Sequence, residues 1–332
     1  MGRSRVFTVL LGVGIIALIA SALLSIASGP INISLSQVVH LLMHRDNSTD
    51  SIIIYSSRLP RTIVAIFAGA AFAVAGCIMQ AVSRNPLACP SILGINQGAA
   101  LCIVVMLLLV PGITTLIFIP IAFLGGLIAA ALIFLITATV GMSPLRLALA
   151  GVTVNALFHA ISRALLILFP NNAQAVIFST MGSLGGRTWT HVDMILPWIA
   201  VGLVLSVMSY RYLNLFNLGQ EHAKGLGLNA NRAQFVLLLL AVVLASSAVS
   251  VVGPIPFVGL IIPNAMRYVM GANHRYLVPL SIVYGALLLL LSDTLIRLFN
   301  PVVEIPVGII VALIGGPFFV FVARTQTKGG SA

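Results

Sequence analysis

The chain has very few charged residues for its length. Only 7% of its 332 residues are Asp, Glu, Lys or Arg, whereas an average soluble domain carries about 25%. A water-facing surface cannot be built from so few charges, and hydrophobic residues make up 60% of the sequence. Disorder and coiled coils are excluded by the same scarcity, because both need many charges. The composition therefore predicts a polytopic membrane protein.

Acidic residues are the scarcest of all, with six against 17 basic residues, which gives a net charge of +11. Because the excess arises from missing acids rather than from clustered bases, it is a poor indication of nucleic-acid binding. Asp193, Asp293 and Glu304 are the acids near predicted spans, and all three lie close to outer ends. A proton-driven carrier would place carboxylates in mid-membrane, so this scarcity disfavours a self-sufficient secondary transporter.

Motifs for catalysis are also missing. The sequence contains no GxxxxGK[ST] loop and no HExxH, and its three cysteines show no CxxC spacing. Residues 182–185 read Gly-Ser-Leu-Gly, which does not match the GxSxG pattern of serine hydrolases. An intramembrane enzyme is therefore a distant alternative. We expect a transport subunit that binds no cofactor or metal and takes its energy from partner chains.

Ten apolar stretches are candidates for membrane spans, since a bilayer core of about 30 Å needs roughly 20 apolar residues per helix. They cover residues 8–27, 61–83, 92–111, 114–139, 147–169, 194–212, 233–252, 257–271, 277–297 and 306–324. The eighth is short and is bounded by prolines. We therefore expect an all-α fold with one permease domain over residues 1–332, extracytoplasmic loops at 28–60 and 170–193, and a cytoplasmic segment at 213–232.

Basic residues set the predicted orientation. If the N-terminus is cytoplasmic, the inner side carries Arg3, Arg5, Arg84, Arg146, Arg211, Lys224, Arg232, Arg267, Arg275, Arg324 and Lys328. This bias follows the positive-inside rule, and ten spans then place both termini in the cytoplasm. In the second span Ala65, Gly69, Ala73 and Cys77 recur every four residues, a stripe that favours close helix packing within one subunit over a dimer seam.

Several motifs occur in a fixed order along the chain. They are Arg58-Leu59-Pro60-Arg61, Gly76 to Gln80, Asn85-Pro86-Leu87-Ala88 with Pro90 and Leu93-Gly94, Leu218-Gly219 through Leu226-Gly227, Gly259 to Pro263 with Arg267, and Glu304 to Gly308. Together they resemble the signature of the FecCD-type permeases, the membrane subunits of bacterial ABC importers for iron-siderophores, haem and cobalamin. The resemblance covers residues 58 to 320.

The resemblance implies a set of partners and a location. The permease would form half of a dimeric pore in the bacterial cytoplasmic membrane, with an identical or paralogous second subunit. Two cytoplasmic ATPase subunits and an extracytoplasmic substrate-binding protein would complete the importer. An iron-siderophore complex is the expected cargo, and haem and cobalamin are the alternatives.

Arginines at outer span ends are candidate docking residues. In the resembled family the RLPR arginines, and an arginine before the ELPxG motif, pair with acids of the binding protein; the matching residues are Arg58, Arg61 and Arg297. A single arginine would more simply anchor a helix end in the headgroups. Two guanidiniums joined by a rigid proline favour docking, whereas Asp293 could satisfy Arg297 locally, because the two residues are four apart on one helix.

The cytoplasmic segment contains a short polar stretch bracketed by glycines, which on its own predicts no more than a surface helix. The resemblance implies a coupling helix that contacts the ATPase, with Gly219, Glu221, Ala223 and Gly227 as contact or shaping residues.

Two further positions are candidates for the pathway. The resemblance places Asn85 and Leu87 at the cytoplasmic gate, although an ordinary Asn-Pro turn explains them as well. His159 and Arg163 share one face of the fifth span. Arg163 either extends to the outer interface, or this face meets an anionic ferric chelate, since the resemblance implies that the span lines the central cavity. Asn264 departs from the family, which often has His there, so a titrating group at this position is excluded.

Overall fold

The computed structural model describes residues 2–110, 117–140, 144–170, 180–218, 230–300 and 304–329, and no strand occurs among them. The long helices are α1 (Arg3–Ala27), α4 (Leu59–Ser83), α5 (Ile95–Leu109), α6 (Phe118–Val140), α7 (Pro144–Leu168), α9 (Trp189–Met208), α12 (Ala230–Val252), α13 (Val258–Met270), α14 (His274–Phe299) and α15 (Val307–Gly329). Shorter ones are α2 (Leu35–Met43), α3 (Thr49–Ile53), the π-helix η1 (Ile54–Arg58) and α10 (Tyr210–Leu218). The predicted all-α fold is confirmed.

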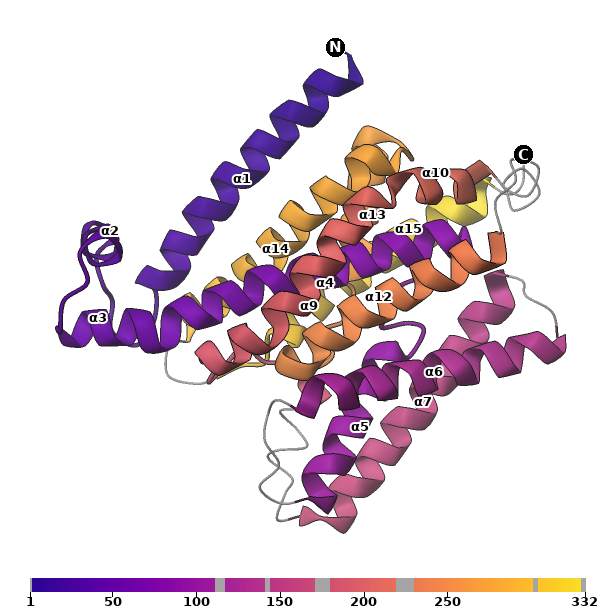
Figure 1. The fold of residues 1–332 in the computed structure, drawn as a ribbon, viewed down its shortest axis with the longest axis horizontal. Coiled ribbons are helices and arrows are strands. Elements are labelled where there is room, and N and C mark those ends of the chain that lie inside the picture. Colours follow the sequence, from indigo (N-terminus) through magenta and orange to yellow (C-terminus); the bar gives the residue numbers. More distant parts are fainter. Residues whose placement is uncertain are drawn as a thin grey trace.

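Each of the ten predicted spans coincides with one of the long helices. Eight helical stretches in the described ranges are long and apolar enough to cross a membrane. The other two, α5 with 15 residues and α13 with 13, are shorter than a bilayer core requires. The chain is thus a multi-pass membrane protein, while the count of ten spans stays a prediction. Figure 1 shows α1 beginning and α15 ending toward the same side of the molecule; the cytoplasmic location of both ends stays a prediction.

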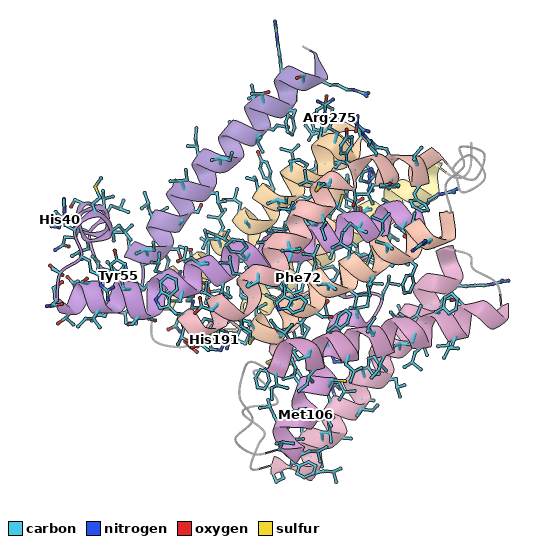
Figure 2. All side chains as sticks on the ribbon, viewed as in Figure 1. His40, Tyr55, Phe72, Met106, His191 and Arg275 are labelled. Atoms are coloured by element: carbon cyan, nitrogen blue, oxygen red, sulfur yellow. The ribbon has the colours of Figure 1, made fainter. Side chains whose placement is uncertain are left out.

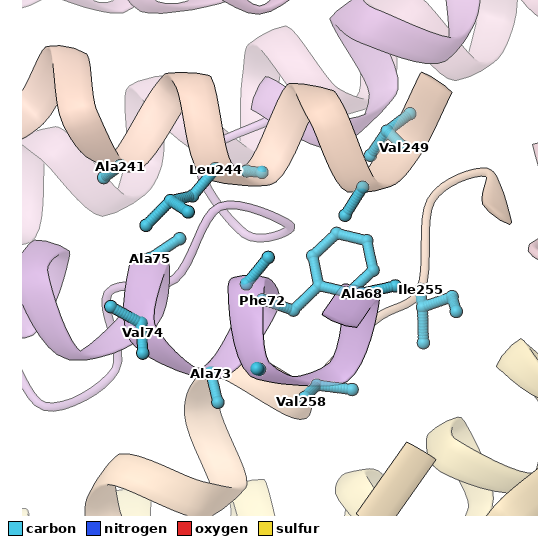
Figure 3. Packing of buried hydrophobic residues seen from close by; sticks show 14 of the residues in the cluster. Ala68, Phe72, Ala73, Val74, Ala75, Ala241, Leu244, Val249, Ile255 and Val258 are labelled. Carbon is cyan, nitrogen blue, oxygen red and sulfur yellow. The ribbon is translucent and has the colours of Figure 1, made fainter. Parts of the chain in front are cut away.

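Helix α4 forms the centre of the bundle. It packs against α14, α12, α13 and α9, and 19 of its 25 residues are buried. Phe72 lies near the middle of the molecule (Figure 2) and is 1% exposed. Its ring points toward the side of the core where Val249 of α12 and Ile255 lie, as Figure 3 shows. Helices α5, α6 and α7 form a separate group that joins the centre through α12 (Figure 1).

The small-residue stripe of α4 packs within the subunit, as predicted. A Cβ atom on Gly69 would lie only 2.3 Å from the carbonyl oxygen of Gly285 in α14. A Cβ atom on Gly76 would lie 1.9 Å from the carbonyl oxygen of Gly259 in α13. No side chain fits at either crossing, so these glycines allow the backbones to touch.

Residues 28–60 are not the simple loop that was predicted. They contain α2, α3 and η1, and the last two continue into α4 as one helix over Thr49–Ser83. The wide π-helical turn directly precedes Pro60, which lacks an N–H and whose ring would clash with the carbonyl four residues earlier. The turn carries Arg58 at its end.

The Gly-Ser-Leu-Gly segment has a structural role. The amide of Ser183 donates to the carbonyl of Val252 at 2.8 Å, where α12 ends, and the amide of Gly308 in α15 donates to the carbonyl of Gly182 at 3.3 Å. The segment therefore ties α12 to α15 beside the proline-rich break at residues 253–257.

Candidate docking and gate sites

A buried carboxylate joins the N-terminal end of α4 to the C-terminal end of α14, the ends that are predicted to be outer. Asp293, with its side chain 2% exposed, accepts hydrogen bonds from Arg61 Nε at 3.0 Å and Arg61 Nη2 at 2.7 Å. Arg297 Nε donates to the same carboxylate at 3.1 Å, which confirms the predicted local pair. Two guanidiniums on one buried acid form a charge-assisted network with strict geometry.

Arg58 and Arg297 together cap the outer end of α1. Arg58 Nη1 donates to the carbonyls of Ile26 at 2.7 Å and Ala27 at 2.8 Å, and its Nη2 donates to a carbonyl further along the chain, that of Ile31. Arg297 Nη1 donates to the carbonyls of Ser25 at 2.8 Å and of residue 28 at 3.0 Å. The carbonyls of Ser25, Ile26 and Ala27 belong to the last turn of α1, where a helix leaves carbonyls without intrahelical partners and carries the negative end of its dipole.

The capping contacts bear on the docking prediction. Arg58 is 5% exposed and anchors the end of α1 through backbone carbonyls, a role that the sequence analysis did not consider beside docking and lipid headgroups. Arg61 is the more exposed of the two RLPR arginines on its side chain, at 15%, and Arg297 is 10% exposed there. Docking by these three residues stays a prediction, and only Arg61 and Arg297 retain partial access to solvent.

Two further charged residues belong to this cluster and were not selected from the sequence. Glu304 lies 3.8 Å from Arg61 Nη1, its side chain is 53% exposed, and its carboxylate packs directly against the backbone of Gly185. Arg187 Nη2 donates to the carbonyl of Ser183 at 3.3 Å. Burial lowers the pKa of Arg187 to about 10, an effect that Glu304 opposes and Arg61 reinforces. Arg187 lies on the side predicted to be outer, against the positive-inside trend, and this feature of the sequence could have marked it as a member of the cluster.

The inner end of α4 carries the predicted gate residues. The helix stops where Arg84 adopts a left-handed conformation, with φ 50°. Asn85 Oδ1 then accepts a hydrogen bond from the amide of Leu87 at 2.9 Å, which closes a short Asx turn. Asn264 Nδ2 donates to the carbonyls of Pro86 at 2.7 Å and Leu260 at 2.8 Å. The residue that departs from the family thus joins the gate turn to α13.

A cavity of about 560 Å³ adjoins this turn. Asn85 and Leu87 line it, together with mostly apolar side chains from α6, α12 and α15 that include Ile133, Phe235 and Phe319. The two predicted gate residues therefore share one cavity wall.

His159 and Arg163 do not line this cavity. Both are exposed on α7, beside apolar side chains such as Val152 and Leu157, which are 55% and 51% exposed. Because α7 packs on α5 and α6, this is the face of α7 that those helices leave open. The structure brings His159 and Arg163 onto one face, as the spacing predicted.

The predicted coupling residues Gly219, Glu221, Ala223 and Gly227 lie outside the described residues. The helices on either side, α10 and α12, end at Leu218 and begin at Ala230.

Comparison with known proteins adds the family. The model of the FecCD transport family matches residues 17–325. The chain is 40% identical to the Fe(3+)-citrate import system permease protein YfmE of Bacillus subtilis (strain 168), over 94% of each chain. It is also 40% identical to the hemin transport system permease protein HmuU of Yersinia pestis, over 82% of this chain and 83% of that one.

A solved structure agrees in fold. An inward-facing conformation of a metal-chelate type ABC transporter superposes with a TM-score of 0.80 at 28% identity, covering 96% of this chain and 99% of that chain. The relatives are transport permeases rather than enzymes. With a family match over most of its length and a superposable fold, the chain belongs to the FecCD transport family.

Proposed function

We propose that the chain is the permease subunit of a bacterial ABC importer in the cytoplasmic membrane, and that it translocates an iron-siderophore complex. The observation that carries this proposal is the placement of the two candidate sites at opposite ends of α4. The arginine cluster of Arg61 and Arg297 lies at the outer end, and the gate turn of Asn85 and Leu87 lies at the inner end.

The cargo is inferred from relatives. The iron-citrate, iron-hydroxamate and hemin permeases among them carry chelated iron according to their names. An iron-siderophore complex therefore fits best, and haem and cobalamin are alternatives. The chain would bind no cofactor. A cytoplasmic ATPase dimer would hydrolyse ATP, and its conformational change would reach the permease through the segment around Glu221. Alternating access would follow from differential binding of nucleotide to the two states of the complex.

The binding protein would dock chiefly on Arg61. Arg297 shares Asp293 with Arg61, and Arg58 fixes the end of α1. Arg61 is held by Asp293 on one side, while its Nη1 lies near the exposed Glu304. Acidic residues of an approaching binding protein would compete with Glu304 for this guanidinium. Electrostatic complementarity of this kind mainly raises the rate of association and fixes register.

Uptake into proteoliposomes tests the importer and its cargo together. Permease, ATPase and binding protein would be reconstituted, and radiolabelled ferric siderophores, haem and cobalamin offered with and without internal ATP. ATP-dependent accumulation of a ferric siderophore is expected. Accumulation without ATP would indicate a secondary transporter, and ATP-dependent uptake of haem or cobalamin alone would replace the proposed cargo.

Two opposed variants test docking. Arg61→Gln should weaken binding of the substrate-binding protein several-fold, because a cation facing its acids is lost. Glu304→Gln should strengthen it, because a competing carboxylate is removed. Titration of labelled binding protein onto the reconstituted complex measures both, with copurification of the ATPase as the control for folding. Equal affinities in both variants and the parent chain would contradict docking at Arg61.

A further inference from the structure

Helix α2 is a short amphipathic helix outside the central bundle. It begins with a capping box, in which Ser34 Oγ accepts from the amide of Gln37 at 3.3 Å and Gln37 Oε1 accepts from the amide of Ser34 at 3.2 Å. The reciprocal bonds fix where the helix starts. Figure 1 shows α2 end-on while α1 and α4 extend across the view, so its axis runs across the long helices.

One part of its apolar surface is packed inside the chain. Val38 and Leu41 are 0% and 6% exposed, and they form a small core with Ile26, Ile33 and Ile54. This core joins the outer end of α1 to the start of the π-helix. The position of α2 is therefore fixed relative to the outer ends of α1 and α4.

A second apolar stripe on α2 is left uncovered. Leu35, Val39 and Met43 recur every four residues and are 48%, 42% and 75% exposed. The remaining arc carries the polar residues Ser36 and His40, and His40 is visible at the edge of the molecule in Figure 2. Three of the nine residues of the helix are thus apolar and not used for packing within the described chain.

Side chains in the segments that follow α2 and at the start of α9 are of the types found at a membrane–water boundary. The guanidinium of Arg45 lies over the ring of Tyr55, 4.7 Å from its centroid. Trp189 Nε1 donates to the carbonyl of Tyr55 at 2.7 Å, and a cavity of about 440 Å³ lies among these residues. Tyrosine, tryptophan and arginine gather where acyl chains meet headgroups.

Exposed apolar side chains also occur where α1 ends. Leu24, in the last turns of α1, and Ile31, beyond it, are 45% and 53% exposed. An exposed apolar residue on a membrane span, such as Leu24, normally faces lipid. A helix that runs across the spans and carries an apolar stripe beside a polar arc has the features of an interfacial helix.

We propose that α2 lies in the outer headgroup boundary of the bilayer, with Leu35, Val39 and Met43 in contact with acyl chains and His40 facing water. The contact fixes the depth of the outer arginine cluster, because the same small core holds α2, the end of α1 and the residues just before Arg58. This proposal does not depend on the cargo or on the docking role of Arg61.

Spin labels on the two faces of α2 test the proposal. Val39→Cys and His40→Cys would each be made in a Cys102→Ala background, since Cys77 and Cys89 are 0% and 1% exposed and therefore inaccessible to the label. The labelled complex would be placed in nanodiscs of phosphatidylethanolamine and phosphatidylglycerol. Collision of each label with oxygen, which concentrates in acyl chains, and with a water-soluble nickel chelate would be measured with and without binding protein.

The label at residue 39 should collide several-fold more with oxygen than with the nickel chelate, and the label at residue 40 should show the reverse. Met43→Cys repeats the first measurement on the same stripe. A stripe label that meets mainly the nickel chelate would place α2 in water and overturn the proposal. A stripe label shielded from both reagents would mean that a protein covers this face, which would also overturn the proposal. Shielding seen only when the binding protein is present would identify that protein, and shielding seen without it would identify the second permease.

Discussion

Replacing Asp293 with asparagine is the sharpest perturbation of the outer cluster. Asp293→Asn keeps the shape of the side chain but removes the only negative charge that touches both Arg61 and Arg297 in the described part of the chain. Because the Asp293 side chain is 2% exposed, water has little access to the position where the carboxylate compensated the two guanidinium charges. Breaking a buried ion pair in this way costs about 3–5 kcal/mol, chiefly because a buried charge is left uncompensated.

The two arginines differ in how much they would lose. Arg61 is 15% exposed and still has Glu304 at 3.8 Å. Arg297 keeps its bonds to the end of α1, including Nη2 to Ser25 Oγ at 2.6 Å, but in the described part of the chain it forms no ion pair with another acid. We therefore expect a loss of about 3 kcal/mol, the lower end of the range, for Asp293→Asn.

Reversible unfolding in detergent micelles would measure this loss. Arg61→Gln alone should cost less, because Asp293 keeps Arg297. In the double variant, Arg61→Gln with Asp293→Asn, the total should fall short of the sum of the single losses, because Arg61→Gln removes the repulsion between Arg61 and Arg297 that Asp293→Asn alone leaves. A loss below about 1 kcal/mol for Asp293→Asn, the range of exposed pairs, would refute the idea of a buried network.

Two other substitutions have definite expected outcomes. Gly76→Ala should destabilise the fold by about 1–3 kcal/mol, because the new Cβ would lie 1.9 Å from the backbone of Gly259. Gly12→Ala is the matched control, because Gly12 lies in open space on α1. Equal stability of the two variants would contradict the close crossing. Asn264→Ala should cost about 1–3 kcal/mol by removing the side-chain donor to the carbonyl of Pro86, with Asn264→His intermediate. Unfolding midpoints and protease cleavage at the gate turn would measure it, and an unchanged turn would contradict this role.

The helices and their order were predictable because each span is an apolar stretch of bilayer length, and a membrane leaves the backbone few alternatives to a helix. The pair of Asp293 and Arg297 was predictable for a similar reason, since four residues along one helix bring side chains together. Arg61 and Asp293 are separated by 232 positions, and no local rule relates them. Only the crossing of α4 and α14, which Gly69 and Gly285 permit, brings that pair together.

The role of Arg58 shows why the sequence left the docking site ambiguous. A guanidinium at the outer end of a span can bond to lipid headgroups, to a partner protein or to carbonyls of its own chain, and the local sequence is the same in all three cases. The fold selects the third for Arg58, because α1 ends against it.

This choice decides how docking experiments should be interpreted. Loss of binding in an Arg58 or Arg297 variant would follow from displacement of α1 alone, since both residues hold its last carbonyls. Arg61 makes no such contact to α1 among its hydrogen bonds, and Glu304 is half exposed beside it. Opposite shifts in affinity from Arg61→Gln and Glu304→Gln cannot arise from a common structural defect. That pair of variants therefore separates docking from architecture, which charge reversal of both RLPR arginines would not.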